Sequence, residues 1–178
     1  MLEDAVELRL IPINPFRKLV TTAPDPNDDR QVEISTEASL AILNACPDWE
    51  WRLIFGLMRW GGLRCPSELK IKWSEVLQDR FLVHSPKTEH RAGKENRWTP
   101  MFKELEPLFQ EAYDMANDGA VYVLGQRRNS GHKALTDQYL KILMKAGVSV
   151  YPKPFTNLRS SRVTELTRSG LPPHLESA

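Results

Sequence analysis

The sequence Arg-Trp-Gly-Gly-Leu-Arg-Cys-Pro-Ser-Glu-Leu occupies positions 59–69 and follows a run of apolar residues at helical spacing. Its two glycines are predicted to end that helix, because glycine adopts the left-handed C-terminal turn without a Cβ penalty. Pro66 suits the first turn of a second helix, where a missing N–H costs nothing. Arg64 is therefore predicted on a short, rigid connector between two helices. The spacing alone is equally consistent with a structural role, in which Arg64 pairs with Glu68 to fix a helix corner.

The length and composition exclude several classes of protein. The chain has 178 residues, with 41% apolar and 26% charged residues, as in an ordinary soluble globular domain. No apolar run reaches the length of a membrane span, and the acidic first 17 residues are not a signal peptide. Cys46 and Cys65 form no disulfide or metal pattern and predict a reducing, cytoplasmic setting. Four scattered histidines predict no zinc site, and we expect no metal and no cofactor.

The charge is unevenly distributed along the chain. Residues 1–50 have a balance of −6 and residues 51–178 a balance of +7, which together give the net charge of +1. A basic body behind an acidic lead-in favours a polyanionic partner, although many proteins with this balance bind no nucleic acid.

Hydrophobic periodicity predicts an α+β fold, mainly α-helical, with a small antiparallel β-sheet. Residues 1–34 are predicted to be an extended lead-in, because four prolines interrupt them, and residues 35–178 to be the folded domain. Helices are expected over about 35–46, 49–60, 102–112, 135–146 and 156–166, the last capped by Thr156 or Asn157. Residues 80–84 and 97–101 flank a polar tip and predict a β-hairpin, with Lys87 where the first strand enters the tip.

Arg159 has an unusual position on the last predicted helix. At 100° per residue it falls in the middle of the apolar stripe that Leu158, Val163 and Leu166 form, and Thr156 lies on the same side. An arginine there must find a carboxylate or a phosphate, since burial without a partner would cost several kcal/mol.

Three short motifs occur in the order found in the tyrosine recombinases, the phage-integrase family. Arg64 ends Gly-Gly-Leu-Arg, Lys87 enters a β-hairpin, and Arg159 ends Thr-Asn-Leu-Arg. Arg97 begins Arg-Trp-Thr-Pro, which is similar to the Arg-x-x-Pro that follows the hairpin in this family. The resemblance covers roughly residues 35–178 and implies the fold of a recombinase catalytic domain.

The resemblance also implies a chemistry that suits these residue types. Arg64 and Arg159 would clamp the non-bridging oxygens of the scissile phosphate with paired hydrogen bonds, and Lys87 would protonate the leaving 5′ oxygen. Thr156 would hydrogen-bond the phosphate, and Glu68 would orient Arg64. Double-stranded DNA is the expected partner, with self-association on DNA. The other cations expected to contact DNA are Lys94, Arg97, Arg127, Arg128, Lys133 and Arg162.

Two departures from the family pattern bear on activity. The family usually has a histidine three residues before its second arginine, where this chain has Thr156, and a hydroxyl is no general base near pH 7. The family also places a nucleophilic tyrosine well after that arginine, whereas all four tyrosines here precede Arg159. We therefore expect a catalytic domain that is incomplete at its C-terminal end, binds DNA weakly by itself and forms no covalent bond with it.

Two other interpretations remain open from the sequence. One is a non-catalytic DNA-binding module that keeps the phosphate clamp but has lost the reaction, which Thr156 and the missing nucleophilic tyrosine favour. The other is a helical interaction protein in which Arg64 and Arg159 form structural ion pairs. Salt-dependent DNA binding separates these, because an interaction protein would bind no DNA.

Overall fold

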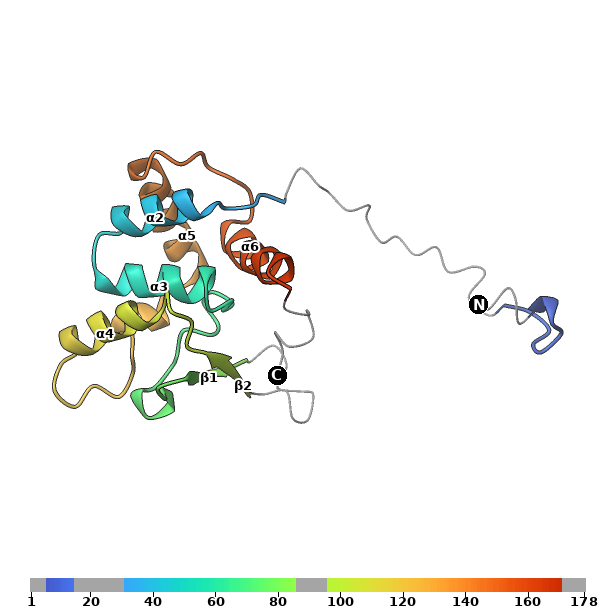
Figure 1. The fold of residues 1–178 in the computed structure, drawn as a ribbon, viewed down its shortest axis with the longest axis horizontal. Coiled ribbons are helices and arrows are strands. Elements are labelled where there is room, and N and C mark those ends of the chain that lie inside the picture. Colours follow the sequence, from blue (N-terminus) through green and yellow to red (C-terminus); the bar gives the residue numbers. More distant parts are fainter. Residues whose placement is uncertain (1–5, 15–30, 86–95, 171–178) are drawn as a thin grey trace.

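The computed structural model describes residues 6–14, 31–85 and 96–170. In these residues it contains five α-helices and one antiparallel sheet of two strands, which confirms the predicted α+β, mainly helical class (Figure 1). The helices are α2 (Thr36–Ala45), α3 (Trp49–Arg59), α4 (Glu106–Met115), α5 (His132–Lys145) and α6 (Pro154–Arg168), and the strands are β1 (Arg80–His84) and β2 (Asn96–Pro100). Within the described ranges, no helix is both long enough and apolar enough to cross a membrane.

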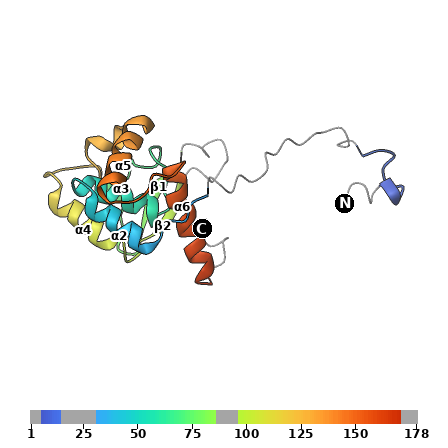
Figure 2. The same cartoon turned by 90° about the horizontal axis from the view of Figure 1, so that it is seen from above.

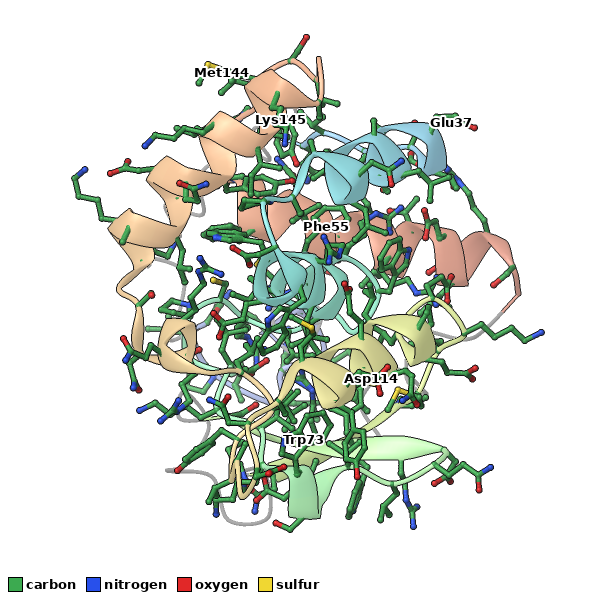
Figure 3. The ribbon with its side chains drawn as sticks, turned by 90° about the vertical axis from the view of Figure 1, so that its left-hand side faces the viewer. Glu37, Phe55, Trp73, Asp114, Met144 and Lys145 are labelled. Carbon is green, nitrogen blue, oxygen red and sulfur yellow. The ribbon has the colours of Figure 1, made fainter. Side chains whose placement is uncertain are left out.

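Helix α3 is the centre of the fold. It begins after Asp48, whose carboxylate accepts a hydrogen bond from the Trp51 backbone N at 3.0 Å, and nearly every later side chain of the helix is buried. Phe55 points into the middle of the helices in Figure 3, between α3 and α5. A Cβ on Gly56 would collide with the side chain of Leu108, so this glycine allows α4 to approach α3 closely.

The remaining helices surround α3 much as the periodicity predicts. Ser35 caps α2, because its hydroxyl accepts from the Ala38 backbone N at 3.2 Å. Helix α5 begins at His132, three residues before the predicted start, and ends ahead of Gly147, which has a φ of +70°. Figures 1 and 2 both place α6 along one side of α3, where its buried residues complete the core.

The predicted β-hairpin is confirmed. Strands β1 and β2 pair antiparallel, with Arg80 opposite Pro100 and His84 opposite Asn96. Phe81 is fully buried and packs against Phe109 of α4, with ring centroids 5.1 Å apart. The predicted tip, residues 86–95, lies outside the described residues.

Two expected helix boundaries are wrong. No second helix starts at Pro66: residues 65–68 form a single turn, closed by a hydrogen bond from the Glu68 backbone N to the Arg64 carbonyl at 3.0 Å. The turn does not propagate, because the chain becomes extended and the Ile71 carbonyl accepts from the Val123 backbone N instead. Neither Thr156 nor Asn157 caps α6, which begins at Pro154, a residue suited to the first helical position.

Candidate functional site

The buried carboxylate of Glu68 is the centre of a cluster of cations. Its Oε2 accepts from the Arg64 backbone N at 2.8 Å and from Arg97 Nη2 at 2.9 Å, and its Oε1 accepts from Arg64 Nη1 at 2.8 Å and from Ser85 Oγ at 2.7 Å. The Glu68 side chain is only 1% exposed. Because a carboxylate offers about four acceptor sites, these bonds use its full capacity and fix both arginines.

The connector before Glu68 positions Arg64. Gly62 has a φ of +65°, which turns the chain out of α3 at little steric cost. Arg64 then lies four residues before Glu68 in the closed turn, and its side chain remains 38% exposed. The local pairing of Arg64 with Glu68 is therefore present, and it leaves part of the Arg64 guanidinium open to solvent.

Helix α6 brings Arg159 to the same connector from 95 positions away in sequence. The Arg159 side chain crosses Gly62 so closely that a Cβ there would lie 3.7 Å from Arg159 Cγ. In the described part of the chain, the Arg159 guanidinium has no hydrogen-bond or ion-pair partner. Burial, and then repulsion from Arg64, lowers the pKa of Arg159, with Glu68 opposing that change and Arg97 adding to it.

The cluster carries an excess of positive charge. Three guanidinium groups face one carboxylate, so two positive charges lack a partner within it. Burial likewise lowers the pKa of Arg97, an effect that attraction to Glu68 opposes and repulsion from Arg64 increases. Arginine nevertheless stays charged at any physiological pH. A tetrahedral oxyanion between Arg64 and Arg159 would relieve this repulsion and accept paired hydrogen bonds.

Thr156 lies one helical turn before Arg159 and is exposed at the start of α6. Its backbone N donates to the carbonyl of Lys153 at 3.0 Å, and Lys153 adopts a left-handed conformation with a φ of +45°. Residues three apart on a helix share a face, so Thr156 and Arg159 lie on the same side of α6.

The cations at positions 127 and 128 lie in the loop before α5, and Lys133 lies in the first turn of α5; the two arginines use much of their charge within the protein. Arg127 pairs with Asp48 at 2.5 Å and with Glu50 at 3.2 Å. Arg128 lies over the ring of Tyr122, 4.4 Å from its centroid. Lys133 forms only an exposed pair with its helical neighbour at position 137 and is 89% exposed. Of these three cations, Lys133 is the least constrained.

Arg162 has its partners outside the Glu68 cluster. Arg162 is 12% exposed, stacks on Phe102 at 4.3 Å and pairs with Glu104 at 3.2 Å. Lys87 and Lys94 fall in the hairpin tip, outside the described residues. Sequence reasoning missed Ser85 entirely, because a serine after a strand carries no signal of its own.

The chain's tyrosines occupy ordinary structural positions. Tyr139 is fully buried and its hydroxyl lies 2.7 Å from that of Tyr151, which is 7% exposed. Burial raises the pKa of Tyr139 and raises that of Tyr151 to about 12. Tyr113 contacts Trp73 edge to face. The buried pair is thus sealed from any external reactant.

Solved structures of recombinases and integrases share the fold of this chain. The chain superposes on XerA recombinase with a TM-score of 0.64 at 20% identity, over 78% of this chain and 52% of that one. It matches the Tn1549 transposon integrase in complex with transposon right-end DNA with a TM-score of 0.63 at 16% identity, over 97% and 65%. The chain has the fold of tyrosine recombinase catalytic domains.

A lambda integrase dimer bound to a core site has the same recombinase fold, with a TM-score of 0.59 at 18% identity, over 94% of this chain and 62% of that one. The chain thus spans between about half and two thirds of the length of these recombinase chains. No family model matches its sequence, and no curated protein does. The superpositions show the fold alone, because the identities are only 16–20%. Any chemistry has to be argued from the residues of this chain.

Proposed function

We propose that this chain is part of a DNA strand breaking-and-rejoining domain, in which Arg64 and Arg159 clamp the scissile phosphate. The observation that carries the proposal is the half-buried Arg159 guanidinium, which lies beside Arg64 and has no anionic partner among the described residues. The Tn1549 integrase with this fold is bound to DNA, which supports double-stranded DNA as the partner. The lambda integrase dimer at its core site supports self-association on DNA.

Each proposed role follows from the chemistry of phosphodiester transfer. As an oxygen nucleophile attacks phosphorus, negative charge builds on the non-bridging oxygens, and two guanidinium groups stabilise it. The proton that the departing 5′ oxygen needs would come from Lys87. Thr156 would donate a hydrogen bond to the phosphate, and Glu68 would hold Arg64 and Arg97 in place. The other five cations would contribute at most to binding of the DNA backbone; they are Lys94, Lys133, Arg127, Arg128 and Arg162.

A non-catalytic DNA-binding module is the second candidate. Thr156 favours it, because a threonine hydroxyl is no general base, and the Tyr139–Tyr151 pair favours it, because neither buried hydroxyl is available as a nucleophile. We accordingly expect this chain alone to form no covalent adduct with DNA. A tyrosyl–DNA bond trapped with this chain would rule the second candidate out. Cys46 and Cys65 are not joined in a disulfide, which supports the proposal of a cytoplasmic protein.

Fluorescence anisotropy with a short labelled DNA duplex, across a salt series, tests the proposal. Wild type is compared with Arg64→Ala, Arg159→Ala and the control Arg52→Ala, which removes the same charge from the opposite end of α3. We expect each site variant to weaken binding about 10-fold or more, as for a charged hydrogen bond of roughly 1.5–3 kcal/mol. The slope of log affinity against log salt should fall by about 0.9 per lost phosphate contact.

The control decides how a loss is interpreted. Arg52 pairs with Glu111 on α4, so its removal tests whether any lost arginine weakens DNA binding. Circular dichroism confirms that each variant is folded. If all three variants bind DNA as wild type does, or if wild type binds none, the phosphate clamp is wrong and the arginines are structural.

A further inference from the structure

We propose that the buried arginine Arg59 is a positioning residue for the site: with Glu165 and the backbone of Ile34 it fixes α6, and through α6 the direction of Arg159. The inference rests on the proposed function, since it explains how the two arms of the clamp are kept at a set spacing. Arg59 is not itself a ligand of the phosphate, because its side chain is 1% exposed and all its partners are internal.

Arg59 joins three parts of the chain at one point. Its Nη1 donates to Glu165 Oε2 at 3.0 Å and its Nη2 pairs with Glu165 Oε1, so the contact with α6 is a two-pronged ion pair. Nη2 also donates to the Ile34 carbonyl at 3.0 Å, and Nε donates to Ser39 Oγ of α2 at 2.9 Å. The planar guanidinium therefore sets the relative position of α3, α6 and the segment before α2.

Residues 32–34 form a strap along the same face of α6. The Val32 backbone N donates to Asn157 Oδ1 at 3.3 Å, and the Ile34 backbone N donates to Ser161 Oγ at 2.9 Å. Asn157, Ser161 and Glu165 are spaced by four residues, so they line one side of the helix. The strap and Arg59 together hold that side over about 12 Å of its length.

Arg159 projects from the other side of this helix. At 100° per residue it lies about 160° around from the middle of the Asn157–Ser161–Glu165 face. Any roll of α6 about its axis swings Arg159 toward or away from Gly62 and Arg64. Because Arg59 precedes Arg64 by only five residues, the Arg59–Glu165 pair ties together the two segments that carry the clamp.

A purely structural role would not call for an arginine. Well-packed apolar residues of similar volume usually replace a buried ion pair without loss of stability, whereas an ion pair fixes one register. Here the pair fixes the register of α6 against α3, and that register decides where Arg159 points.

Glu165→Gln and Glu111→Gln are the matched variants for the test. Both glutamates are about one third exposed, at 29% and 33%, and both accept a two-pronged pair from an arginine of α3. Only Glu165 lies on α6, where it also lies 3.5 Å from Arg162 Nη1. Ser161→Ala is a second variant, which removes one strap hydrogen bond and no charge. The readouts are the DNA anisotropy assay and the side-chain N–H signal of Arg159 in ¹H–¹⁵N spectra without DNA.

We expect Glu165→Gln to weaken DNA binding about 5- to 10-fold, as when only 10–20% of molecules keep the competent register, and Glu111→Gln to change it by less than about 2-fold. Ser161→Ala should weaken binding in the same direction, and the Arg159 signal should shift in both α6 variants. In an Arg159→Ala background, Glu165→Gln should cause no further loss of affinity.

The inference would be overturned if Glu165→Gln and Glu111→Gln weakened DNA binding equally. It would also be overturned if Glu165→Gln weakened DNA binding as much in the Arg159→Ala background as in wild type, or if the Arg159 N–H signal did not shift. Failure of the clamp itself has a different pattern, in which Arg64→Ala and Arg159→Ala leave binding unchanged. In that case the Arg159 signal, which needs no DNA, still decides whether Arg59 and Glu165 set the register of α6.

Discussion

Replacing Glu68 with glutamine should destabilise the protein far more than its small change in shape suggests. The wild-type carboxylate is buried and accepts five hydrogen bonds, four of them from Arg64 and Arg97. Glutamine keeps one carbonyl oxygen and turns the other position into an NH₂ donor that faces cationic donors. Bonds to charged groups contribute about 1.5–3 kcal/mol each, and breaking a buried ion pair costs about 3–5 kcal/mol. We expect Glu68→Gln to lower the free energy of unfolding by about 3 kcal/mol.

Urea unfolding followed by fluorescence of the five tryptophans measures this loss. With a slope of about 2 kcal/mol per molar urea, the midpoint should fall by roughly 1.5 M. Glu106→Gln is the control, because Glu106 is exposed in the first turn of α4 and its charge is worth less than about 1 kcal/mol.

Sulfate provides an internal check on the same variant. Without the Glu68 charge, the three arginines have no counter-ion within the part of the chain that the structure describes, so millimolar sulfate should restore more stability to Glu68→Gln than to wild type. If Glu68→Gln and Glu106→Gln differ by less than about 1 kcal/mol, the Glu68 bonds are no better than bonds to water and the reasoning is refuted.

Three further predictions concern the core. Gly56→Ala should destabilise the protein by about 1–3 kcal/mol in urea unfolding, because the new methyl group meets Leu108. Burial raises the pKa of the Cys65 thiol to about 12, so native protein should react with iodoacetamide at pH 8 far more slowly than urea-unfolded protein. The same raised pKa contributes stability below the ordinary thiol pKa, and that contribution is lost as pH rises toward 12. Tyr139→Phe should cost about 1–2 kcal/mol, because the Tyr151 hydroxyl then loses its partner.

The local pattern of apolar and polar residues was sufficient to predict most of the fold. Apolar periodicity placed the helices to within a few residues, since burial on one face is a property of the sequence itself. The hairpin followed from two short runs on either side of a polar tip. The turn at residues 65–68 could not be foreseen, because what stops it from becoming a helix is the pairing of Ile71 with Val123, more than fifty positions away.

The site was predictable only in part, for the same reason. The motif order singled out Arg64 and Arg159, and the structure brings them to one connector. Arg162, on the same helix, is neutralised by Glu104 of another segment and by Glu165 three residues on, whereas Arg159 meets no such residue in the described ranges. The pairing with Glu104 could not be read from the local sequence. The role of the buried Arg59 could not be predicted from the local sequence either, since its partners are 20 to 106 positions away.

The spread of partners around Glu68 bears on the order in which the molecule folds. Contacts of Glu68 with Arg64, Ser85 and Arg97 close loops of 4, 17 and 29 residues. Arg159 closes a far longer loop, and α6 docks through contacts 106 to 127 residues apart in sequence. Loop closure favours the shorter contacts, so the half-site of Arg64, Glu68 and Arg97 can assemble before the last helix arrives. Under the proposed function, the chain would bind an anion only after α6 has docked. Hydrogen exchange should show α6 opening as a separate unit while the half-site stays protected.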